Sequence, residues 1–269
     1  MRALISGSNI NYVLAGPASG PPVVFVHGFP FSLEMWQGQL DAVAAAGYRG
    51  IAYDIRGHGM SDVGDGQYTV ESHVDDLFGL LDHLKVVKPA VAGLSMGGYI
   101  TLRALEREPG RFAAAVLCDT KSEADTNEGR VKRAGGVRAV KTGGSGPYAA
   151  EYVKSMFAPE TFSTNPAAVE PIRQTIARTP PLSIAGTLIA LAARTDTTAS
   201  LGSITIPTLI LVGEKDTVTP PSSAESMHAN IRGAELHIVP GAAHLSNLEN
   251  PTFFNDRLLG FLKRALPIR

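Results

Sequence analysis

Short, uninterrupted apolar runs recur along the chain, and most of them end at glycine, proline or aspartate before a helical stretch. The run Val23 to Val26 is rich in β-branched residues and stops at Gly28 and Pro30, as expected for a strand buried on both faces. Similar runs are Tyr48 to Ile55, Pro89 to Leu94, Phe112 to Asp119, Pro207 to Glu214 and Ala234 to Val239. The repetition predicts an α/β fold, with a mostly parallel central sheet flanked by helices.

Two helices have clear signals at their starts. Thr69 is a suitable N-cap for a helix whose apolar residues recur at steps of three or four. These residues are Val70, Val74, Leu77, Leu81 and Leu84. Asn250 and Pro251 predict the start of the last helix. Its expected buried face comprises Phe254, Leu258, Phe261, Leu262 and Leu266.

Between Lys121 and about Ser203 the strand-like runs give way to helical stretches. These are Glu151 to Phe157, Ala167 to Arg178 and Leu182 to Arg194. We therefore predict a core of residues 1–119 and 204–269, with a helical cap inserted at 120–203. The run Gly143-Gly144-Ser145-Gly146-Pro147 lacks the Lys-Ser/Thr ending of a phosphate-binding loop and follows no strand, so we interpret it as a flexible linker.

Composition narrows the classes of partner. The 269 residues carry 24 Lys and Arg against 25 Asp and Glu, without a basic stripe, so neither nucleic acid nor an anionic membrane surface is an expected partner. Cys118 is the only cysteine, and Met1 to Asn11 lacks the apolar stretch of a secretory signal. We expect a cytoplasmic protein without a membrane span, either a monomer or a small homo-oligomer.

The segment Gly93-Leu94-Ser95-Met96-Gly97-Gly98 contains a G-x-S-x-G pattern. Ala90 to Leu94 is expected to be a strand and Tyr99 to Leu105 a helix, so Ser95 falls on the sharp turn between them. That turn exposes a nucleophile, and small neighbours give it room.

A serine hydroxyl needs a positioned base and an acid that orients the base. Among the seven histidines, only His244 lies in a C-terminal loop of small residues directly after the last expected strand. Asp216 follows the strand Thr208 to Val212 and is the expected acid. Asp119, at the end of the Phe112 strand, is the competing acid, and either gives the order Ser, acid, His.

A tetrahedral intermediate also requires two backbone N–H donors for its oxyanion. One is expected at Met96, directly after the nucleophile. The other is expected at Phe29, in the His27-Gly28-Phe29-Pro30 loop, because Pro30 has no N–H.

Together with the His27 loop and the Ser95 turn, three further segments match one family in order. They are Asp54-Ile55-Arg56-Gly57-His58-Gly59-Met60-Ser61-Asp62, Gly213-Glu214-Lys215-Asp216 and Gly241-Ala242-Ala243-His244. The chain resembles the α/β-hydrolase superfamily over nearly its whole length outside the cap. It is most similar to bacterial carboxylesterases and enol-lactonase-like hydrolases, which cleave small carboxylic esters and lactones without a cofactor. The resemblance implies a serine carboxylesterase acting on a small-molecule ester or lactone, and structural roles for Arg56 and His58.

The acyl and alcohol pockets are expected between the sheet edge and the cap. The candidate lining residues are Phe29, Met96, Phe157, Ile184, Leu188 and Leu191. All are apolar, which suits a small uncharged ester, although apolar residues at helical spacing more often pack against the core.

Several related activities stay open on the sequence alone. A serine at position 95 argues against haloalkane dehalogenases and epoxide hydrolases of this fold, which use an aspartate there. A lactonase, a perhydrolase, a C–C hydrolase and a small-molecule receptor with slow turnover all share the same triad. No H-E-x-x-H pattern or pair of cysteines indicates a metal site.

Overall fold

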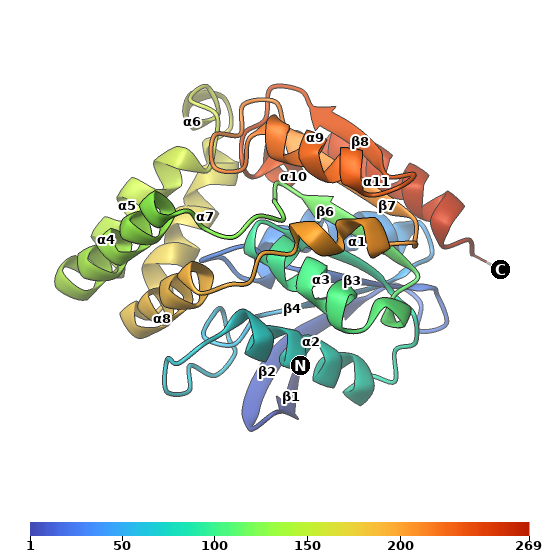
Figure 1. Cartoon of the computed structure of the whole chain (residues 1–269), viewed down its shortest axis with the longest axis horizontal. Helices are drawn as coiled ribbons and strands as arrows, with labels where there is room; N and C mark the ends of the chain where they lie inside the picture. The colour runs from blue at the N-terminus through green and yellow to red at the C-terminus, as the bar shows by residue number, and fades with distance from the viewer. Residues whose placement is uncertain (269) are drawn as a thin grey trace.

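A computed structural model describes residues 1–268, which fold around one eight-stranded sheet (Figure 1). The strands lie in the order β1-β2-β4-β3-β5-β6-β7-β8. Their bounds are β1 Arg2–Ile5, β2 Ser8–Ala15, β3 Pro22–Val26, β4 Arg49–Tyr53, β5 Ala90–Leu94, β6 Ala114–Cys118, β7 Thr208–Gly213 and β8 Glu235–Val239. The six predicted strands are all present, with ends shifted by up to two residues.

The sheet is mostly parallel, as predicted. β2 pairs antiparallel with both β1 and β4, whereas the pairs from β4 through β3, β5, β6 and β7 to β8 are all parallel. Every residue of β5, β6 and β7 is buried, which explains why these strands are continuous apolar runs rather than alternating ones. The carboxyl ends of the parallel strands meet at one edge, where open α/β sheets bind their ligands.

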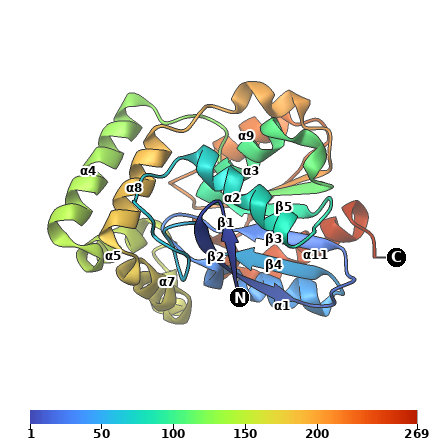
Figure 2. The same ribbon diagram turned by 90° about the horizontal axis from the view of Figure 1, so that it is seen from below.

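Helices cover both faces of the sheet (Figure 2). α1 (Gln37–Ala45) and α11 (Pro251–Ala265) lie on one face, and α2 (Val70–His83), α3 (Met96–Arg107) and α9 (Pro221–Asn230) lie on the other. The short helix α10 spans Ser246–Glu249, and short 3₁₀ helices occur at Leu33–Trp36, Pro109–Arg111, Val153–Ser155 and Thr198–Ser203. Both predicted N-caps are confirmed, because the Thr69 and Asn250 side chains accept hydrogen bonds from the third residue of their helices.

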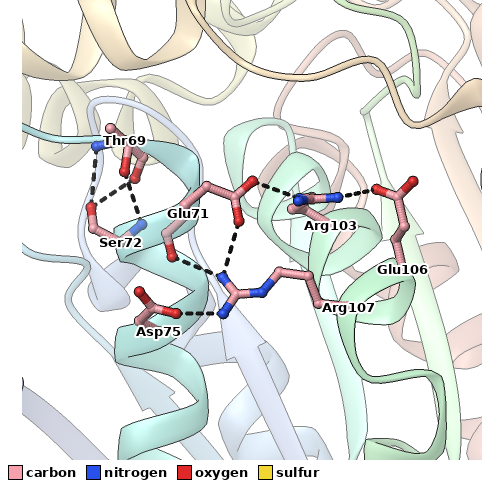
Figure 3. Close-up of polar contacts among 7 residues, drawn as sticks. All are labelled: Thr69, Glu71, Ser72, Asp75, Arg103, Glu106 and Arg107. Carbon is pink, nitrogen blue, oxygen red and sulfur yellow. Dashed lines mark hydrogen bonds and ion pairs between the residues drawn. The ribbon is translucent and has the colours of Figure 1, made fainter.

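Ion pairs hold α3, the helix that follows Ser95, against α2 (Figure 3). Arg103 pairs with Glu71 at 2.6 Å, and Arg107 pairs with Glu71 at 3.1 Å and with Asp75 at 2.6 Å. The Thr69 capping box fixes the start of α2 directly beside these pairs. Because the pairs are partly exposed, each contributes little to stability on its own.

Five helices connect β6 to β7 and gather at one end of the molecule (Figure 1). They are α4 (Asn127–Gly143), α5 (Ser145–Tyr152), α6 (Thr161–Thr164), α7 (Pro166–Arg178) and α8 (Pro181–Ala192). We call α4 to α8 the inserted helices. Their treatment as a separate cap, with boundaries at 120 and 203, stays a prediction.

The predicted flexible linker at Gly143 to Pro147 is wrong. α4 runs to Gly143 and α5 begins at Ser145, so only Gly144, with a φ of +78°, lies between them. Proline is tolerated in the first turn of a helix, which allows Pro147 within α5. No apolar periodicity predicts α4, because Val140 is its only buried residue and the helix has no apolar stripe.

The two ends of the segment that carries the inserted helices are bonded to each other. The Thr197 N–H and hydroxyl both donate to the Ser122 carbonyl, each at 3.1 Å. Arg194, whose side chain is 2% exposed, pairs with Asp125 at 2.6 Å and donates to the Glu123 carbonyl at 2.7 Å. The segment therefore leaves and re-enters the sheet edge at one place.

In the part of the chain that the structure describes, no helix combines the length and hydropathy needed to cross a membrane.

Candidate active site

Ser95 lies between the end of β5 and the start of α3, with a φ of +54°. A non-glycine residue rarely adopts this conformation. The turn is possible because its neighbours are small: a Cβ at Gly97 would collide with the Val26 carbonyl oxygen of β3, and one at Gly93 with the Gly97 carbonyl oxygen. The predicted sharp turn between a strand and a helix is therefore present at Ser95.

The structure brings Ser95, His244 and Asp216 together in one chain of hydrogen bonds. His244 Nε2 lies 2.9 Å from Ser95 Oγ, and His244 Nδ1 lies 2.8 Å from Asp216 Oδ2. Since a carboxylate only accepts, Nδ1 carries the ring proton and Nε2 presents its lone pair to the serine hydroxyl. The hydroxyl thus donates to a neutral imidazole, the arrangement that a general base requires.

The loops after β7 and β8 hold the expected acid and the expected base. Asp216 follows β7, His244 follows β8, and the Lys215 N–H donates to the Ala242 carbonyl at 2.8 Å, which joins the two loops. We call the residues from Gly213 to Thr219 the acid loop and those from Pro240 to Ser246 the base loop. Asp216 and His244 are almost fully buried, while Ser95 keeps 8% of its surface exposed. The hydroxyl is thus the member of the trio that faces an incoming molecule.

Four hydrogen bonds surround the Asp216 carboxylate. Oδ1 accepts from the N–H groups of Val218 at 2.8 Å and Thr219 at 3.0 Å, and Oδ2 accepts from the Thr219 hydroxyl at 2.7 Å and from His244. Burial alone would raise the pKa of Asp216, but interaction with His244 and the bonds from Thr219 outweigh burial and hold it below its ordinary value. Asp216 therefore stays ionised beside the imidazole.

The two expected oxyanion donors are free. Within residues 1–268, neither the Phe29 N–H nor the Met96 N–H donates to another protein group. Met96 is the first residue of α3, where unpaired N–H groups and the helix dipole favour negative charge. The buried ring of His27 fixes the Phe29 loop, because Nδ1 contacts the Gly28 carbonyl at 2.8 Å and Nε2 accepts from the Ile55 N–H at 2.9 Å.

Asp119, the competing acid, does not bond His244. Its Oδ1 accepts from the Gly213 N–H at 2.8 Å and its Oδ2 from the Ser246 hydroxyl at 2.5 Å. Of the two carboxylates that the sequence offered, Asp216 is the one that faces the imidazole.

The six residues expected to line a substrate pocket are all buried. Phe157 lies next to Met156, whose carbonyl accepts from the Leu245 N–H at 3.1 Å, so the connection between α5 and α6 touches the base loop. Contact between these six residues and a substrate stays a prediction. A cavity of about 380 Å³ opens where α7 meets the sheet, lined by Ser32, Asp54 and Thr179 among others, and it does not reach the trio.

Sequence reasoning missed Tyr152 of α5. Its hydroxyl donates to the Phe29 carbonyl at 3.3 Å, and its ring meets that of Phe29 edge to face at 5.7 Å. This contact connects the inserted helices with the Phe29 loop. No sequence signal marks it, because it depends on how α5 lies over a loop more than a hundred residues earlier.

In the described chain, no group of three or more His, Cys, Asp or Glu side chains is arranged to hold a metal ion.

Comparison with known proteins agrees with this geometry. Residues 21–251 match the family model described as alpha/beta hydrolase fold. The chain is 32% identical to 3-oxoadipate enol-lactonase 1 of Acinetobacter baylyi over 257 residues, which cover 96% of this chain and 94% of that protein.

Two solved structures are close in shape. A thermophilic esterase from Thermogutta terrifontis, solved with malate bound, has a TM-score of 0.93 and 32% identity over 98% of both chains. The enol-lactonase from Burkholderia xenovorans has a TM-score of 0.92 and 27% identity, over 98% of this chain and all of that one.

Proposed function

This chain belongs to the α/β-hydrolase family, and from that premise we propose that it is a serine carboxylesterase that cleaves small, mostly apolar esters. The observation that carries the proposal is the hydrogen-bond chain from Ser95 Oγ through His244 to Asp216, beside two free backbone N–H groups. This arrangement supports acyl transfer through a covalent intermediate.

In the proposed reaction, Ser95 Oγ attacks the ester carbonyl as its proton passes to His244 Nε2. The N–H groups of Phe29 and Met96 stabilise the oxyanion that forms. The intermediate collapses to the acyl-enzyme, and His244 gives its proton to the departing alcohol. Water then attacks the acyl-enzyme with His244 again as base, releasing the acid and restoring Ser95. Asp216 keeps the imidazole in the correct tautomer and stabilises its charged form.

A lactone is the second candidate substrate. Two of the relatives above are named enol-lactonases, and a lactone is an ester closed into a ring, so the same steps apply. The leaving alcohol then stays attached to the acyl group. The shape of the pocket that holds the leaving group therefore decides between a lactone and an open ester.

The test is steady-state hydrolysis of p-nitrophenyl esters of increasing acyl length by the purified protein, with Ser95→Ala as control. Many turnovers on short esters, lost in Ser95→Ala, support the proposal and rank the size of the acyl pocket. Retained turnover in Ser95→Ala contradicts it.

Other outcomes discriminate the remaining activities. A single burst without turnover favours a receptor of this fold. If none of the esters is hydrolysed, we would next measure the hydrolysis of lactones with a pH-stat, and then test perhydrolysis with peroxide and the cleavage of C–C substrates.

A further inference from the structure

The end of β6 contacts the backbone of the nucleophile turn. The Ser95 N–H donates to the Cys118 carbonyl at 3.0 Å, and the Thr120 hydroxyl donates to the Ser95 carbonyl at 2.8 Å. Cys118 and Thr120 flank Asp119, so two of the three residues at this strand end hold the nucleophile in place.

Asp119 itself spans the acid loop and the base loop. Gly213, which donates to Oδ1, lies three residues before Asp216. Ser246, which donates to Oδ2, lies two residues after His244. Asp119 and Ser246 are both completely buried. One carboxylate therefore bridges the loops that carry the acid and the base, in addition to the Lys215–Ala242 bond between them, and its neighbours Cys118 and Thr120 fix Ser95.

The fold keeps Asp119 in place at an energetic cost. Its φ is +44°, a left-handed conformation that most residues avoid. Within residues 1–268 no Lys, Arg or His pairs with it, although buried carboxylates are normally paired. Burial, and after it the negative charge of Asp216, raise the pKa of Asp119 well above its usual range. An apolar residue of similar size would avoid the cost of burying a carboxylate but would leave the Gly213 N–H and the Ser246 hydroxyl without an acceptor, so these two bonds are what the carboxylate supplies.

We propose that Asp119 is a positioning residue that aligns His244 with both Ser95 and Asp216 through its bonds to Ser246 and Gly213. The proposal rests on the proposed function, because the pair that Asp119 aligns is the acid and base of the serine hydrolase. Asp119 touches neither substrate nor imidazole. Its removal leaves two buried donors without a partner, and the two loops shift as these donors find new ones. A shift of about 1 Å in a catalytic group costs about 100-fold in rate.

Two substitutions at Asp119 separate alignment from charge. In Asp119→Asn the amide oxygen still accepts from the Gly213 N–H, and the NH₂ donates to the Ser246 hydroxyl, which is able to accept. Asp119→Ala loses both bonds. Ser246→Ala removes only the bond to the base loop.

Asp76→Ala is the matched control for losing a buried carboxylate. Asp76 is also fully buried, but it pairs with Arg56 at 2.6 Å and bonds neither the acid loop, the base loop nor the turn at Ser95. Its loss destabilises the protein without acting on the trio.

The experiment measures kcat and KM on one p-nitrophenyl ester for these variants, together with the rate constant for fluorophosphonate labelling of Ser95, which needs no particular ester. Circular dichroism gives the folded fraction. For Asp119→Ala we expect kcat and the labelling rate to fall about 100-fold with KM within about threefold, since alignment and not binding is lost. Asp119→Asn keeps kcat within about fivefold, and Ser246→Ala falls between the two. Asp76→Ala lowers the melting temperature but not kcat per folded molecule.

Three results overturn the positioning role. The first is an Asp119→Ala loss that matches its unfolded fraction, as for Asp76→Ala. The second is an Asp119→Asn loss as deep as that of Asp119→Ala, which would show that charge is required instead of alignment. The third is a Ser246→Ala enzyme with wild-type kcat, which decides the matter even where Asp119→Ala does not fold.

The same measurements distinguish failure of the proposed function from failure of the positioning role. If wild-type Ser95 neither labels nor turns over substrate, both proposals are rejected. If it labels normally and Asp119→Ala labels equally fast, only the positioning role is rejected.

Discussion

The hydrogen bonds around Asp216 predict what an isosteric Asp216→Asn substitution does. Two backbone N–H groups, of Val218 and Thr219, point at Oδ1. Because backbone donors cannot be reversed, the asparagine carbonyl oxygen takes the Oδ1 position. The NH₂ then occupies the Oδ2 position, 2.8 Å from His244 Nδ1.

An NH₂ at that position forces the wrong tautomer. It donates to Nδ1, so the ring proton moves to Nε2, which faces Ser95 Oγ at 2.9 Å. Such an imidazole cannot accept the serine proton. We expect kcat to fall about 10⁴-fold, which corresponds to about 5.4 kcal/mol of activation free energy. KM stays within a few-fold because Asp216 is buried behind the imidazole and does not meet substrate.

The assay is p-nitrophenyl ester hydrolysis between pH 6 and 9, with circular dichroism to confirm folding and Asp119→Asn as the matched control. Asp119→Asn retains turnover within about fivefold, because an amide still satisfies both of its partners. An Asp216→Asn enzyme within tenfold of wild type, together with a larger loss in Asp119→Asn, would refute the reasoning and assign the acid's role to Asp119.

Three further predictions concern stability. Thr69→Ala removes the N-cap of α2 and lowers the free energy of unfolding, measured by urea titration, by about 1 kcal/mol. An unchanged urea midpoint would contradict this and show that the α2–α3 ion pairs hold the start of α2 without the cap. Arg194→Met leaves Asp125 with Arg133 as its remaining partner and lowers the free energy of unfolding by about 3 kcal/mol. We expect residues 120–203 to be cleaved faster by a protease than in the wild type, and an equal cleavage rate would contradict this. Burial, followed by nearby positive groups, lowers the pKa of His73 to about 3, below the value of about 6.5 expected when unfolded. Between these two pKa values the unfolded chain binds a proton that the folded chain does not. The stabilising contribution of the neutral, buried His73 is therefore complete above a pH of about 6.5 and is lost as the pH falls toward 3. We therefore expect the free energy of unfolding of His73→Leu to fall less steeply than that of the wild type as the pH decreases over that range. Urea titrations at several pH values measure this, and plots of unfolding free energy against pH that run parallel for the two proteins would contradict it.

The sheet was predictable from the sequence because a strand buried on both faces must be apolar at every position. β5, β6 and β7 are buried at every position, and each is a continuous apolar run. The Ser95 turn was predictable for a related reason, since the glycines at 93 and 97 are required by a close approach of backbone. Their spacing is therefore fixed by sterics and visible without coordinates.

Elements held by polar or distant contacts were not predictable. α4 has one buried residue, so no periodicity marks it. Asp119 was recognised as a titratable group at a strand end, but its bonds to Gly213 and Ser246 join residues 94 and 127 positions away. Both carboxylates follow neighbouring strands of the sheet, and which of them faces His244 depends on the packing of the loops.

The bonds from Thr197 to Ser122 and from Arg194 to Glu123 and Asp125 place the entry and exit of the inserted helices side by side. Because the two chain connections of this segment lie together, a change in its length or helix content imposes no strain on strand order or register. Such a change leaves the surroundings of the trio unaltered where the anchoring bonds, and the contacts of Tyr152 with Phe29 and of Met156 with Leu245, are kept. The inserted helices are in this way separable from the sheet, and chimaeras joined between Asp125 and α4 and between α8 and Arg194 would exchange them while keeping the bonds that anchor their two ends.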